Sequence, residues 1–337
     1  MSLRPDDLLA MARRHAKTLL PFMTPAKALN ASLALAELES HREVCRSRPF
    51  MFRIDPCTAC NLRCPSCSSH TAVTAEKRVM SLADFRTVID RVHRHALRAS
   101  LYDMGEPLMN RDFYRMAACA GARGVSTLAS TNFNLFDEGD LDDLFASRLT
   151  VLEPCLDGFT QESYATYRVR GDVEKVKAGI RAVMERKRAT GSKWPLVDVQ
   201  VVLFDHIMHE LPRIERFLKG VGVDAVTYRQ ENLGFNSAET SLADKAGTRP
   251  RCFWLYFGMM VRPDGRVYPC CGLDFDRFSY GSLLEQSLDE IWNNEYYRFS
   301  RRLFTPGPDL PFDERMRGVP CLTCHTFRPV RGMRAAS

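Results

Sequence analysis

The sequence has no hydrophobic run long enough to cross a bilayer as a helix. Its longest apolar stretch, Phe253–Val261, is far shorter than the roughly 20 residues that a spanning helix needs. It also shows no secretory signal, because Met1–Asp7 is charged and no apolar segment follows it. We therefore expect a cytoplasmic protein without a transmembrane segment.

Charge of one sign is not concentrated anywhere in the chain. Lys and Arg number 47 against 41 Asp and Glu, and the two signs are interleaved. Nucleic-acid-binding proteins usually gather Lys and Arg in one patch or stripe, so we expect no nucleic-acid partner. One basic segment with an apolar face, Leu8–Leu20, leaves peripheral contact with a membrane surface open.

Cysteine, in contrast, is abundant, with 12 residues in 337. In a reducing cytoplasm, closely spaced thiols favour metal binding over disulfides. Cys60, Cys64 and Cys67 form a C-x3-C-x2-C pattern directly after the apolar run 51–54. A cubane iron–sulfur cluster usually has four thiolate ligands, so three thiols leave one iron open. Cys57 adds a fourth thiol upstream and keeps a zinc knuckle open as the alternative.

The segment Cys60–Cys67, C-N-L-R-C-P-S-C, resembles the cluster loop of the radical S-adenosylmethionine (radical SAM) superfamily. The resemblance implies a [4Fe-4S] cluster held by Cys60, Cys64 and Cys67, with Cys57 as a spare thiol. In that family the open iron binds SAM, and reductive cleavage of SAM gives a 5'-deoxyadenosyl radical that takes a hydrogen atom from the substrate.

Beyond residue 49, short apolar segments alternate with helical patterns. We expect strands near 51–55, 99–103, 125–130, 149–155, 197–203 and 223–228, and helices near 81–96, 110–122, 137–147, 172–189 and 208–220. This alternation predicts a parallel sheet with right-handed crossovers. Six such units resemble the partial (β/α)6 TIM-like barrel of radical SAM enzymes, whose sites gather at the C-terminal strand ends.

The barrel is expected to span residues 49–232, after an N-terminal helical extension over 1–48. In that extension Thr24 is a helix cap followed by a proline, and one face of the helix is apolar. That face consists of Ala26, Leu29, Leu33, Ala36 and Leu38. Residues 233–251 lack periodicity and are expected to form a linker.

The turn after the second expected strand reads Met104-Gly105-Glu106-Pro107. Glycine permits close backbone approach, and a carboxylate beside it can accept hydrogen bonds from an ammonium group. The turn resembles the family's G-G-E-P motif, which implies that Gly105 and Glu106 hold the SAM amino group. Ser130 and Asn132 follow the third strand, where the family places polar side chains against SAM. A helix-entry turn is the alternative there.

The fourth strand ends in Cys155-Leu156-Asp157-Gly158, and Arg168 follows. The segment resembles the family's S-x-D-G and Y-x-x-Y-R motifs, which implies that Asp157 and Arg168 lie around SAM. Cys155 stands in the Ser position and is our candidate hydrogen-atom donor. A buried Cys is commonly an inert small hydrophobe, and that is the alternative.

A second group of cysteines comes after the linker, with a hairpin predicted by the Asp-Gly turn between the first two. Four thiols from a hairpin and a distant C-x2-C can close around zinc or an iron–sulfur cluster. The spacing resembles the SPASM domain and its shortened twitch form. The resemblance implies a C-terminal domain over 252–337 with one auxiliary [4Fe-4S] cluster. Its expected ligands are Cys252, Cys270, Cys321 and Cys324.

The resemblance implies a radical SAM enzyme with SAM and two [4Fe-4S] clusters. A flavodoxin- or ferredoxin-like donor would supply its electrons. An auxiliary cluster favours net oxidation. We expect a small polyol, amino sugar or nucleoside-like substrate, since no winged-helix leader-binding domain precedes the barrel. The alternatives are a peptide (RiPP) maturase and a non-enzymatic zinc-stabilised binding module. Asp103, Glu153 and Glu231 are unranked candidates for a general base.

Overall fold

The fold is built on one mixed sheet. The computed structural model describes residues 14, 16–67, 77–231, 251–270, 278–324 and 329–334 of the chain. In this part of the chain the sheet has eight strands in the order β6-β5-β4-β3-β2-β1-β7-β8. The strands are β1 (Met51–Ile54), β2 (Arg98–Ser100), β3 (Ser126–Thr131), β4 (Val151–Pro154), β5 (Leu196–Leu203), β6 (Ala225–Gln230), β7 (Gly258–Val261) and β8 (Val267–Tyr268).

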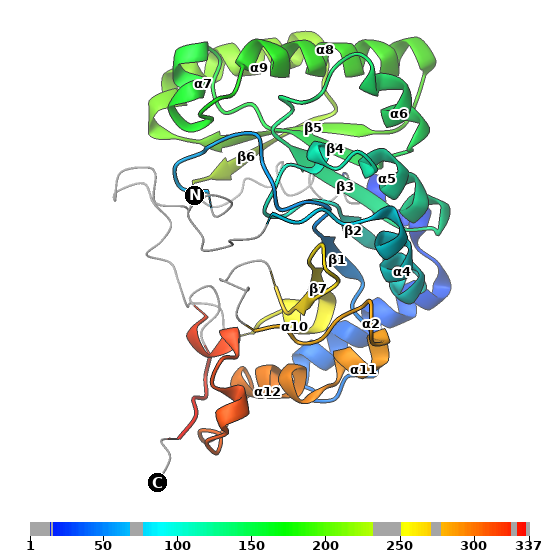
Figure 1. The fold of residues 1–337 in the computed structure, drawn as a ribbon, viewed down its shortest axis with the longest axis vertical. Coiled ribbons are helices and arrows are strands. Elements are labelled where there is room, and N and C mark those ends of the chain that lie inside the picture. The colour runs from blue at the N-terminus through cyan, green and yellow to red at the C-terminus, as the bar shows by residue number, and fades with distance from the viewer. Residues whose placement is uncertain are drawn as a thin grey trace.

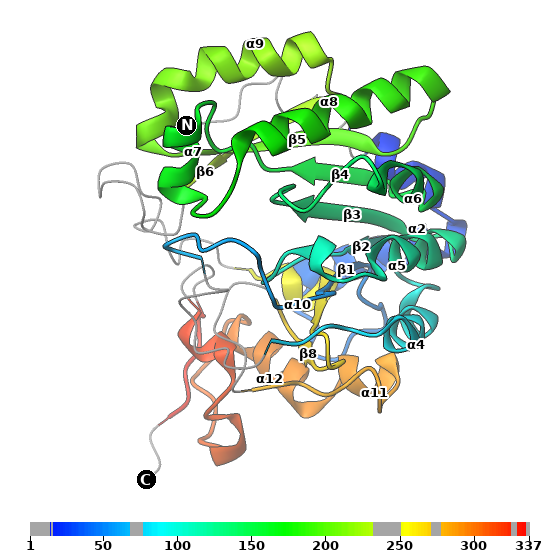
Figure 2. The same cartoon turned by 45° about the horizontal axis from the view of Figure 1, so that its top comes forward.

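Strands β1 to β6 pair parallel with their neighbours in chain order, which confirms the six predicted strands and the partial barrel. In the described residues the barrel is open, because the two edge strands of the sheet, β6 and β8, do not pair with each other. Figures 1 and 2 show the curved sheet with its helices along the outer side.

The predicted crossover helices are all present. They are α4 (Leu82–Val92), α5 (Phe113–Ala122), α6 (Asp140–Ala146), α8 (Val173–Thr190) and α9 (Leu211–Val221). Ser81 caps α4, since its side chain accepts a hydrogen bond from the Asp84 backbone N–H. Three short elements were not predicted: α7 (Gln161–Tyr167) and the 3-10 helices η2 (Pro107–Met109) and η3 (Asp205–Glu210).

The two faces of the sheet differ in chemistry. Alternate strand residues, such as Leu152, pack outward into the main core beneath the helices. On the inner face a small apolar cluster of Leu128, Val151 and Leu196 covers only part of the sheet. Because side chains alternate along a strand, Glu153 and Cys155 share the inner face with Val151. The inner face of the barrel is therefore partly polar, as a reaction cavity requires.

The N-terminal segment begins with residues 16–19, which are helical, and a 3-10 turn, η1 (Leu20–Phe22). The Arg14 side chain forms an ion pair with Asp198 of β5 and donates a hydrogen bond to Thr227 of β6, so it faces the barrel. The rest of the basic segment proposed for a membrane surface, 8–13 and 15, lies outside the described residues. No helix in the described ranges is long and apolar enough to cross a membrane.

Helix α2 (Pro25–Glu39) begins at the predicted cap, where the Thr24 side chain accepts from the Lys27 N–H. The predicted apolar face is only partly buried: Leu38 belongs to the core, but Leu29 is 72% exposed, whereas Glu37 is buried. The Glu37 carboxylate accepts hydrogen bonds from the backbone N–H groups of Arg46 and Ser47 and from the Ser47 hydroxyl. These bonds compensate for the burial of a charge, so a polar face turns inward.

The C-terminal region continues the sheet. Strand β7 pairs parallel with β1, and β8 returns antiparallel to β7 through the predicted Asp-Gly hairpin. Its Gly265 adopts φ +78°, which favours glycine. Beyond it lie α11 (Leu288–Trp292), α12 (Glu295–Leu303) and the 3-10 turns η5 (Glu314–Met316) and η6 (Pro320–Thr323). Helix α10 (Trp254–Phe257) precedes β7. The expected linker falls almost wholly on 232–250, outside the described residues.

The inverted face of α2 leads to a paired prediction. Glu37→Ala leaves buried N–H groups without their acceptor and is expected to lower the free energy of unfolding by about 2–3 kcal/mol. Leu29→Ser, at an exposed position of the same helix, is expected to change it by less than about 0.5 kcal/mol. Chemical denaturation of both variants checks this. A larger loss in Leu29→Ser would contradict the observed orientation.

Candidate active site

The cluster loop follows β1 and folds back on itself. Its backbone closes a turn in which the Cys67 N–H donates to the Cys64 carbonyl at 3.2 Å. Donors surround two of its sulfurs. Leu62 N lies 3.4 Å and Asn132 Nδ2 3.8 Å from Cys60 Sγ, and Arg168 Nη1 lies 3.9 Å from Cys64 Sγ. Hydrogen bonds of this kind stabilise cluster-bound thiolate and tune its potential.

The three thiols are neighbours. The pKa of Cys60 is raised to about 11, chiefly by burial; the Leu62 N–H opposes the rise, and the charges of Glu106, Cys64 and Cys67 contribute to it. In the described ranges, however, no three His, Cys, Asp or Glu side chains converge to metal-ligand distance. The donor set still suits an iron–sulfur cluster by its chemistry, since three thiols share one short loop with N–H and guanidinium donors around their sulfurs.

Cys57, the spare thiol, is fully buried at the start of the loop. Its sulfur lies 3.3 Å from the Ala59 N–H, and its backbone forms an isolated antiparallel bridge with Val79. Cys57 therefore has a place in the local packing of the loop.

Gly105 lies directly against the cluster loop. A Cβ atom there would meet the Cys57 carbonyl oxygen at 2.1 Å and the Ala59 oxygen at 2.4 Å. The next residue, Glu106, donates its N–H to the same Ala59 oxygen at 2.8 Å. Only glycine permits this approach, so the turn after β2 and the cluster loop form one unit.

The Glu106 carboxylate is buried and points to β3. It accepts from Thr131 Oγ1 at 2.6 Å, from the Asn132 N–H at 2.8 Å and from the Leu108 N–H at 3.1 Å. Asn132 in turn donates to Asn61 Oδ1 at 2.8 Å, inside the cluster loop. The predicted residues Gly105, Glu106 and Asn132 are thus brought together at the ends of β2 and β3.

Asp157 and Arg168 form a buried ion pair beside the loop. Arg168 Nε lies 2.7 Å and Nη2 2.5 Å from Asp157 Oδ2, and the other carboxylate oxygen accepts from the Val202 N–H at 2.7 Å. The Asp157 charge raises the pKa of Arg168 well above its ordinary value despite burial, which acts in the opposite direction. A fixed cation therefore stands next to Cys64.

Cys155 lies on the inner face between β3 and β5. Its sulfur is 3.7 Å from Ser130 Oγ and 3.8 Å from Gln200 Nε2. Burial raises the pKa of the Cys155 thiol to about 12, so the S–H form persists at neutral pH. A protonated thiol suits hydrogen-atom donation better than nucleophilic attack, which requires the thiolate.

In the C-terminal region, Cys252, Cys321 and Cys324 are neighbours. Burial raises the pKa of Cys252, and the charges of Cys321 and Cys324 add to the rise. Cys270 packs against Met260 and Tyr268 of the hairpin. These four predicted ligands come from the hairpin, its approach and η6, while Cys271 lies outside the described residues.

The geometry ranks the three candidate carboxylates. Asp103 accepts ion pairs from Arg53 and Arg262, and Glu231 is the last residue described before 251. Glu153 is 5% exposed, and within the described part of the chain its Oε2 has no hydrogen-bond partner. Burial and the Asp198 charge raise the pKa of Glu153 to about 7. A buried carboxylate of this kind marks a functional-site candidate.

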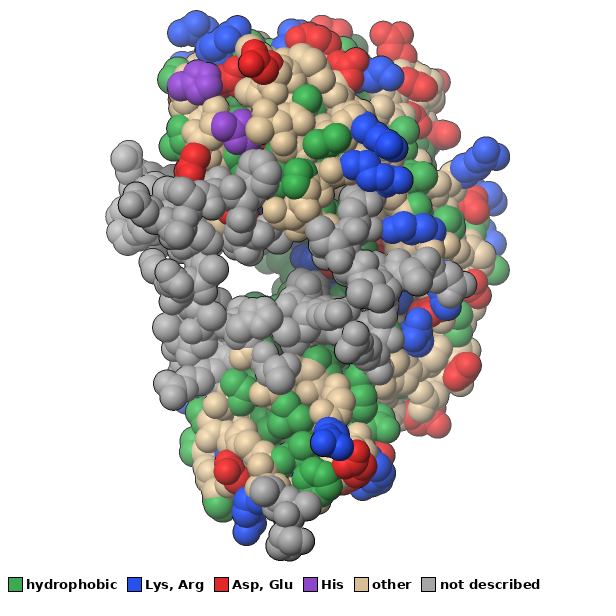
Figure 3. Space-filling model, turned by 60° about the vertical axis from the view of Figure 1, so that its left-hand side comes forward, with side chains coloured by type: hydrophobic (Ala, Val, Ile, Leu, Met, Phe, Trp, Pro, Cys, Tyr) green, Lys and Arg blue, Asp and Glu red, His purple; other side chains and the backbone are tan. Residues whose placement is uncertain are grey.

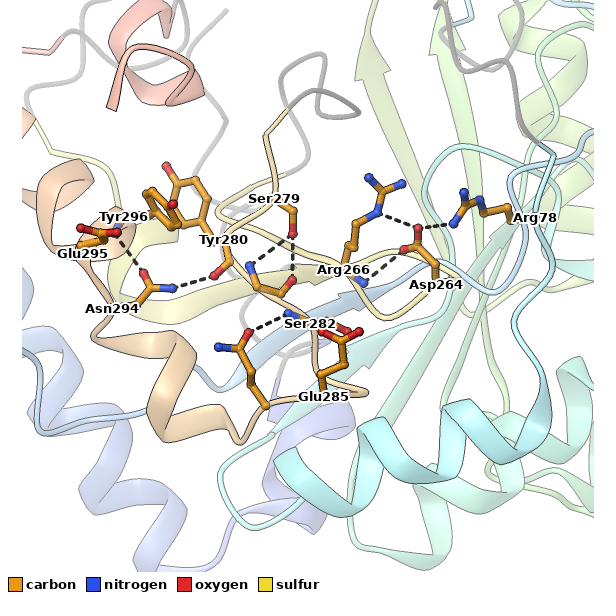
Figure 4. A pocket seen from close by; sticks show the side chains of 12 residues that line it. Arg78, Asp264, Arg266, Ser279, Tyr280, Ser282, Glu285, Asn294, Glu295 and Tyr296 are labelled. Atoms are coloured by element: carbon orange, nitrogen blue, oxygen red, sulfur yellow. Dashed lines mark hydrogen bonds and ion pairs between the residues drawn. The ribbon is translucent and has the colours of Figure 1, made fainter. Parts of the chain in front are cut away.

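One pocket lies away from these residues. It has a volume of about 670 Å³ and sits between the hairpin turn and α11–α12 (Figure 4). Its rim carries the ion pairs of Arg78 and Arg266 with Asp264. The Asn294 side chain donates to the Tyr280 carbonyl, and the Gln286 side chain accepts from the Ser282 N–H. These two backbone groups are therefore already hydrogen-bonded within the protein. None of the predicted site residues lines this pocket.

The predicted site lies instead at the carboxyl ends of the strands. Figure 3 shows the molecule from the side to which β3 and β4 point in Figure 2, with described surface of the barrel above and of the C-terminal region below. The cluster loop and the ends of β2, β3 and β4 carry their site residues at this end of the sheet, as parallel barrels require.

Comparison with known proteins agrees with this arrangement. The family model of the Radical SAM superfamily matches residues 54–218, and that of the SPASM iron–sulfur cluster-binding domain matches residues 252–325. The chain therefore belongs to the radical SAM superfamily and carries a SPASM domain. A SAM-binding [4Fe-4S] cluster, SAM and auxiliary iron–sulfur binding follow, which confirms the cofactor prediction, and the zinc-stabilised binding module is set aside.

The chain is 25% identical over 285 residues to the PqqA peptide cyclase of Xanthomonas euvesicatoria pv. vesicatoria, a match that covers 73% of this chain and 75% of the cyclase. Its fold resembles Streptococcus suis SuiB bound to precursor peptide SuiA, with a TM-score of 0.62 at 15% identity over 80% of this chain and 70% of SuiB. It also resembles anSMEcpe with bound AdoMet, with a TM-score of 0.58 at 15% identity over 84% and 91% of the two chains.

The close approach at Gly105 predicts that Gly105→Ala displaces the turn from the cluster loop. We expect a reduced iron content after anaerobic reconstitution and a large loss of SAM binding, because the new Cβ overlaps two backbone oxygens. Gly121→Ala in α5 is the matched control, since nothing lies within 4 Å of its Cβ position. Normal iron content and SAM affinity in Gly105→Ala would contradict the described contact.

The raised pKa of Glu153 predicts a pH-dependent stability difference. The folded protein holds this proton from pH 4.5 up to about 7 while the unfolded chain has released it, so the carboxylate lowers stability increasingly over that range. The stability of Glu153→Gln relative to the parent should therefore rise between pH 5 and 7.5, by at most about 3 kcal/mol. Denaturation across this range tests it, and a difference independent of pH would show an ordinary carboxylate.

Proposed function

We propose that this radical SAM enzyme modifies a peptide, in the manner of a RiPP maturase. The observation that carries the proposal is the extent of the similarity to a PqqA peptide cyclase, which spans 73% of the chain. A structure of SuiB with its precursor peptide has the same fold. These findings support the peptide alternative better than the small polyol, amino sugar or nucleoside-like substrate that we expected.

The expectation of a small metabolite depended on residues 1–48, which we interpreted as a helical extension and not as a winged-helix leader-binding domain. Because that segment bears only on how a leader peptide is recognised, it does not decide whether the substrate is a peptide. In the described residues the sheet does not close on itself, an arrangement that suits an extended substrate.

In the proposed reaction Cys60, Cys64 and Cys67 would hold the cluster, which together with SAM would supply hydrogen-atom abstraction. The chain's own residues position them. Gly105 lets its turn approach the cluster loop, Glu106 fixes that turn to β3, and the Asp157–Arg168 pair places a cation beside Cys64. Ser130 and Asn132 stand at the end of β3, on the SAM side of the cavity in this proposal.

The finer features remain part of the proposal. They are a barrel over 49–232 and a cluster domain over 252–337, with a single auxiliary [4Fe-4S] cluster held by Cys252, Cys270, Cys321 and Cys324. They also include an oxidative outcome, a flavodoxin- or ferredoxin-like electron donor and a cytoplasmic location. The neighbouring positions of Cys252, Cys321 and Cys324 support the ligand set.

The proposal is tested by offering two substrate pools to the reconstituted enzyme with SAM and dithionite. One pool contains short peptides deuterated at their carbon-bound hydrogens, and the other contains deuterated sugars, polyols and nucleosides. We expect only the peptide pool to transfer deuterium into 5'-deoxyadenosine, measured by mass spectrometry. Deuterium from the second pool alone would replace the peptide proposal with the small-metabolite alternative.

Cys155 is the proposed hydrogen-atom donor in a redox-neutral branch of this reaction. Its S–H bond breaks, a C–H bond forms on the substrate radical, and the remaining thiyl radical takes one electron from the flavodoxin-like donor and a proton from solvent. Because thiol hydrogens exchange with water, turnover in D₂O should place deuterium in the product. Cys155→Ala should lose that deuterium, with Cys119→Ala as the control. Retained label in Cys155→Ala would remove this role.

A further inference from the structure

A buried network of charges joins the C-terminal hairpin to the SAM site. Arg262 follows β7 directly, and its Nη1 lies 3.0 Å from Asp103 Oδ2 and 3.2 Å from Asp55 Oδ2. Arg53 of β1 donates to the other oxygen of Asp103 at 3.1 Å. The side chains of Arg262, Asp55 and Asp103 are 6%, 1% and 6% exposed. The guanidinium thus lies between two carboxylates that come from different loops.

The Asp55 carboxylate fixes the backbone of both SAM-site segments. It accepts hydrogen bonds from the Cys57 N–H, at 3.4 Å, and from the Met104 N–H. Cys57 begins the cluster loop, and Met104 begins the turn that carries Gly105. The orientation of these two segments therefore depends on where the Asp55 side chain is held.

Asp103 immediately precedes Met104, so its side chain holds the other end of the same turn. Its carboxylate is shared between Arg53 and Arg262. Arg262 forms ion pairs with both Asp55 and Asp103 through the same nitrogen, Nη1. Two buried carboxylates this close repel each other unless a cation lies between them.

The hairpin holds Arg262 rigidly. Its N–H donates to the Arg266 carbonyl and its carbonyl accepts from the Gly265 N–H, both at 2.9 Å. The preceding residue, Val261, accepts from the Asp55 N–H at 2.9 Å. The fixed backbone, the burial of the side chain and the two ion pairs together hold the guanidinium in place, which is what a positioning group requires.

We propose that Arg262 of the C-terminal hairpin is a positioning residue for SAM, which holds the Met104–Glu106 turn and the start of the cluster loop in their binding geometry through Asp103 and Asp55. The C-terminal region thereby completes the SAM site of the barrel in addition to carrying its own cysteines. This inference is independent of whether the substrate is a peptide.

The test measures SAM binding to the reconstituted, reduced full-length protein, by the change that SAM causes in the electron paramagnetic resonance spectrum of the cluster. Arg262→Gln is expected to assemble normal iron but to bind SAM about 10- to 100-fold more weakly, the usual effect of losing an outer-shell partner. Arg262→Lys, which keeps the charge, should recover part of the affinity. Arg266→Gln, on the same hairpin and 39% exposed, should bind as the parent does.

A second variant allows for the cost of leaving buried carboxylates without their cation. Arg262→Gln combined with Asp103→Asn removes one charge of each sign. Of the four charged groups in the network, one cation, Arg53, and one carboxylate, Asp55, then remain. With normal iron content, this protein is also expected to bind SAM more weakly. Parental SAM affinity in either iron-replete variant would overturn the proposal. It would also be overturned if no Arg262 variant assembled the cluster while Arg266→Gln did, because the role would then be structural.

Discussion

The contact between Gly105 and the cluster loop is the constraint on which the rest of the site depends. The Ala59 carbonyl accepts the Glu106 N–H, and the absent Cβ of Gly105 allows that approach. Once Glu106 is placed, its buried carboxylate binds the end of β3. Hydrogen bonds thus connect the ends of β1, β2 and β3 in sequence, so that the cysteine loop, which has no regular secondary structure, is held by three strands.

The two iron–sulfur regions share one sheet. Strand β1 pairs parallel with both β2 and β7, so the strand that leads into the cluster loop is also the strand that the C-terminal hairpin joins. This continuous pairing fixes the C-terminal hairpin relative to the barrel. The charges of Asp55, Asp103 and Arg262 lie at this junction. A movement of the C-terminal hairpin would therefore displace the carboxylates that hold the SAM-site turns.

The sequence predicted the strands and helices of the barrel because alternating apolar patterns are local. It also predicted the cysteine groups, whose spacing is local as well. It did not predict the buried face of α2, because the burial of Glu37 depends on hydrogen-bond donors at Arg46 and Ser47. Nor did it rank Glu153 or find Arg262, since burial and an ion pair across 207 residues depend on the folded chain. An Arg at the end of a hairpin strand gives no such signal.

The most direct test of the account is the iron and sulfide content of the anaerobically reconstituted protein, with 5'-deoxyadenosine formation measured alongside. The parent and two variants are compared, Cys60→Ala/Cys64→Ala/Cys67→Ala and Cys252→Ala/Cys270→Ala/Cys321→Ala/Cys324→Ala. The account predicts about eight irons in the parent and about four in each variant, since each cubane holds four, with 5'-deoxyadenosine lost in the first variant. Full iron content in the first variant, or 5'-deoxyadenosine formed without those three thiols, would contradict it.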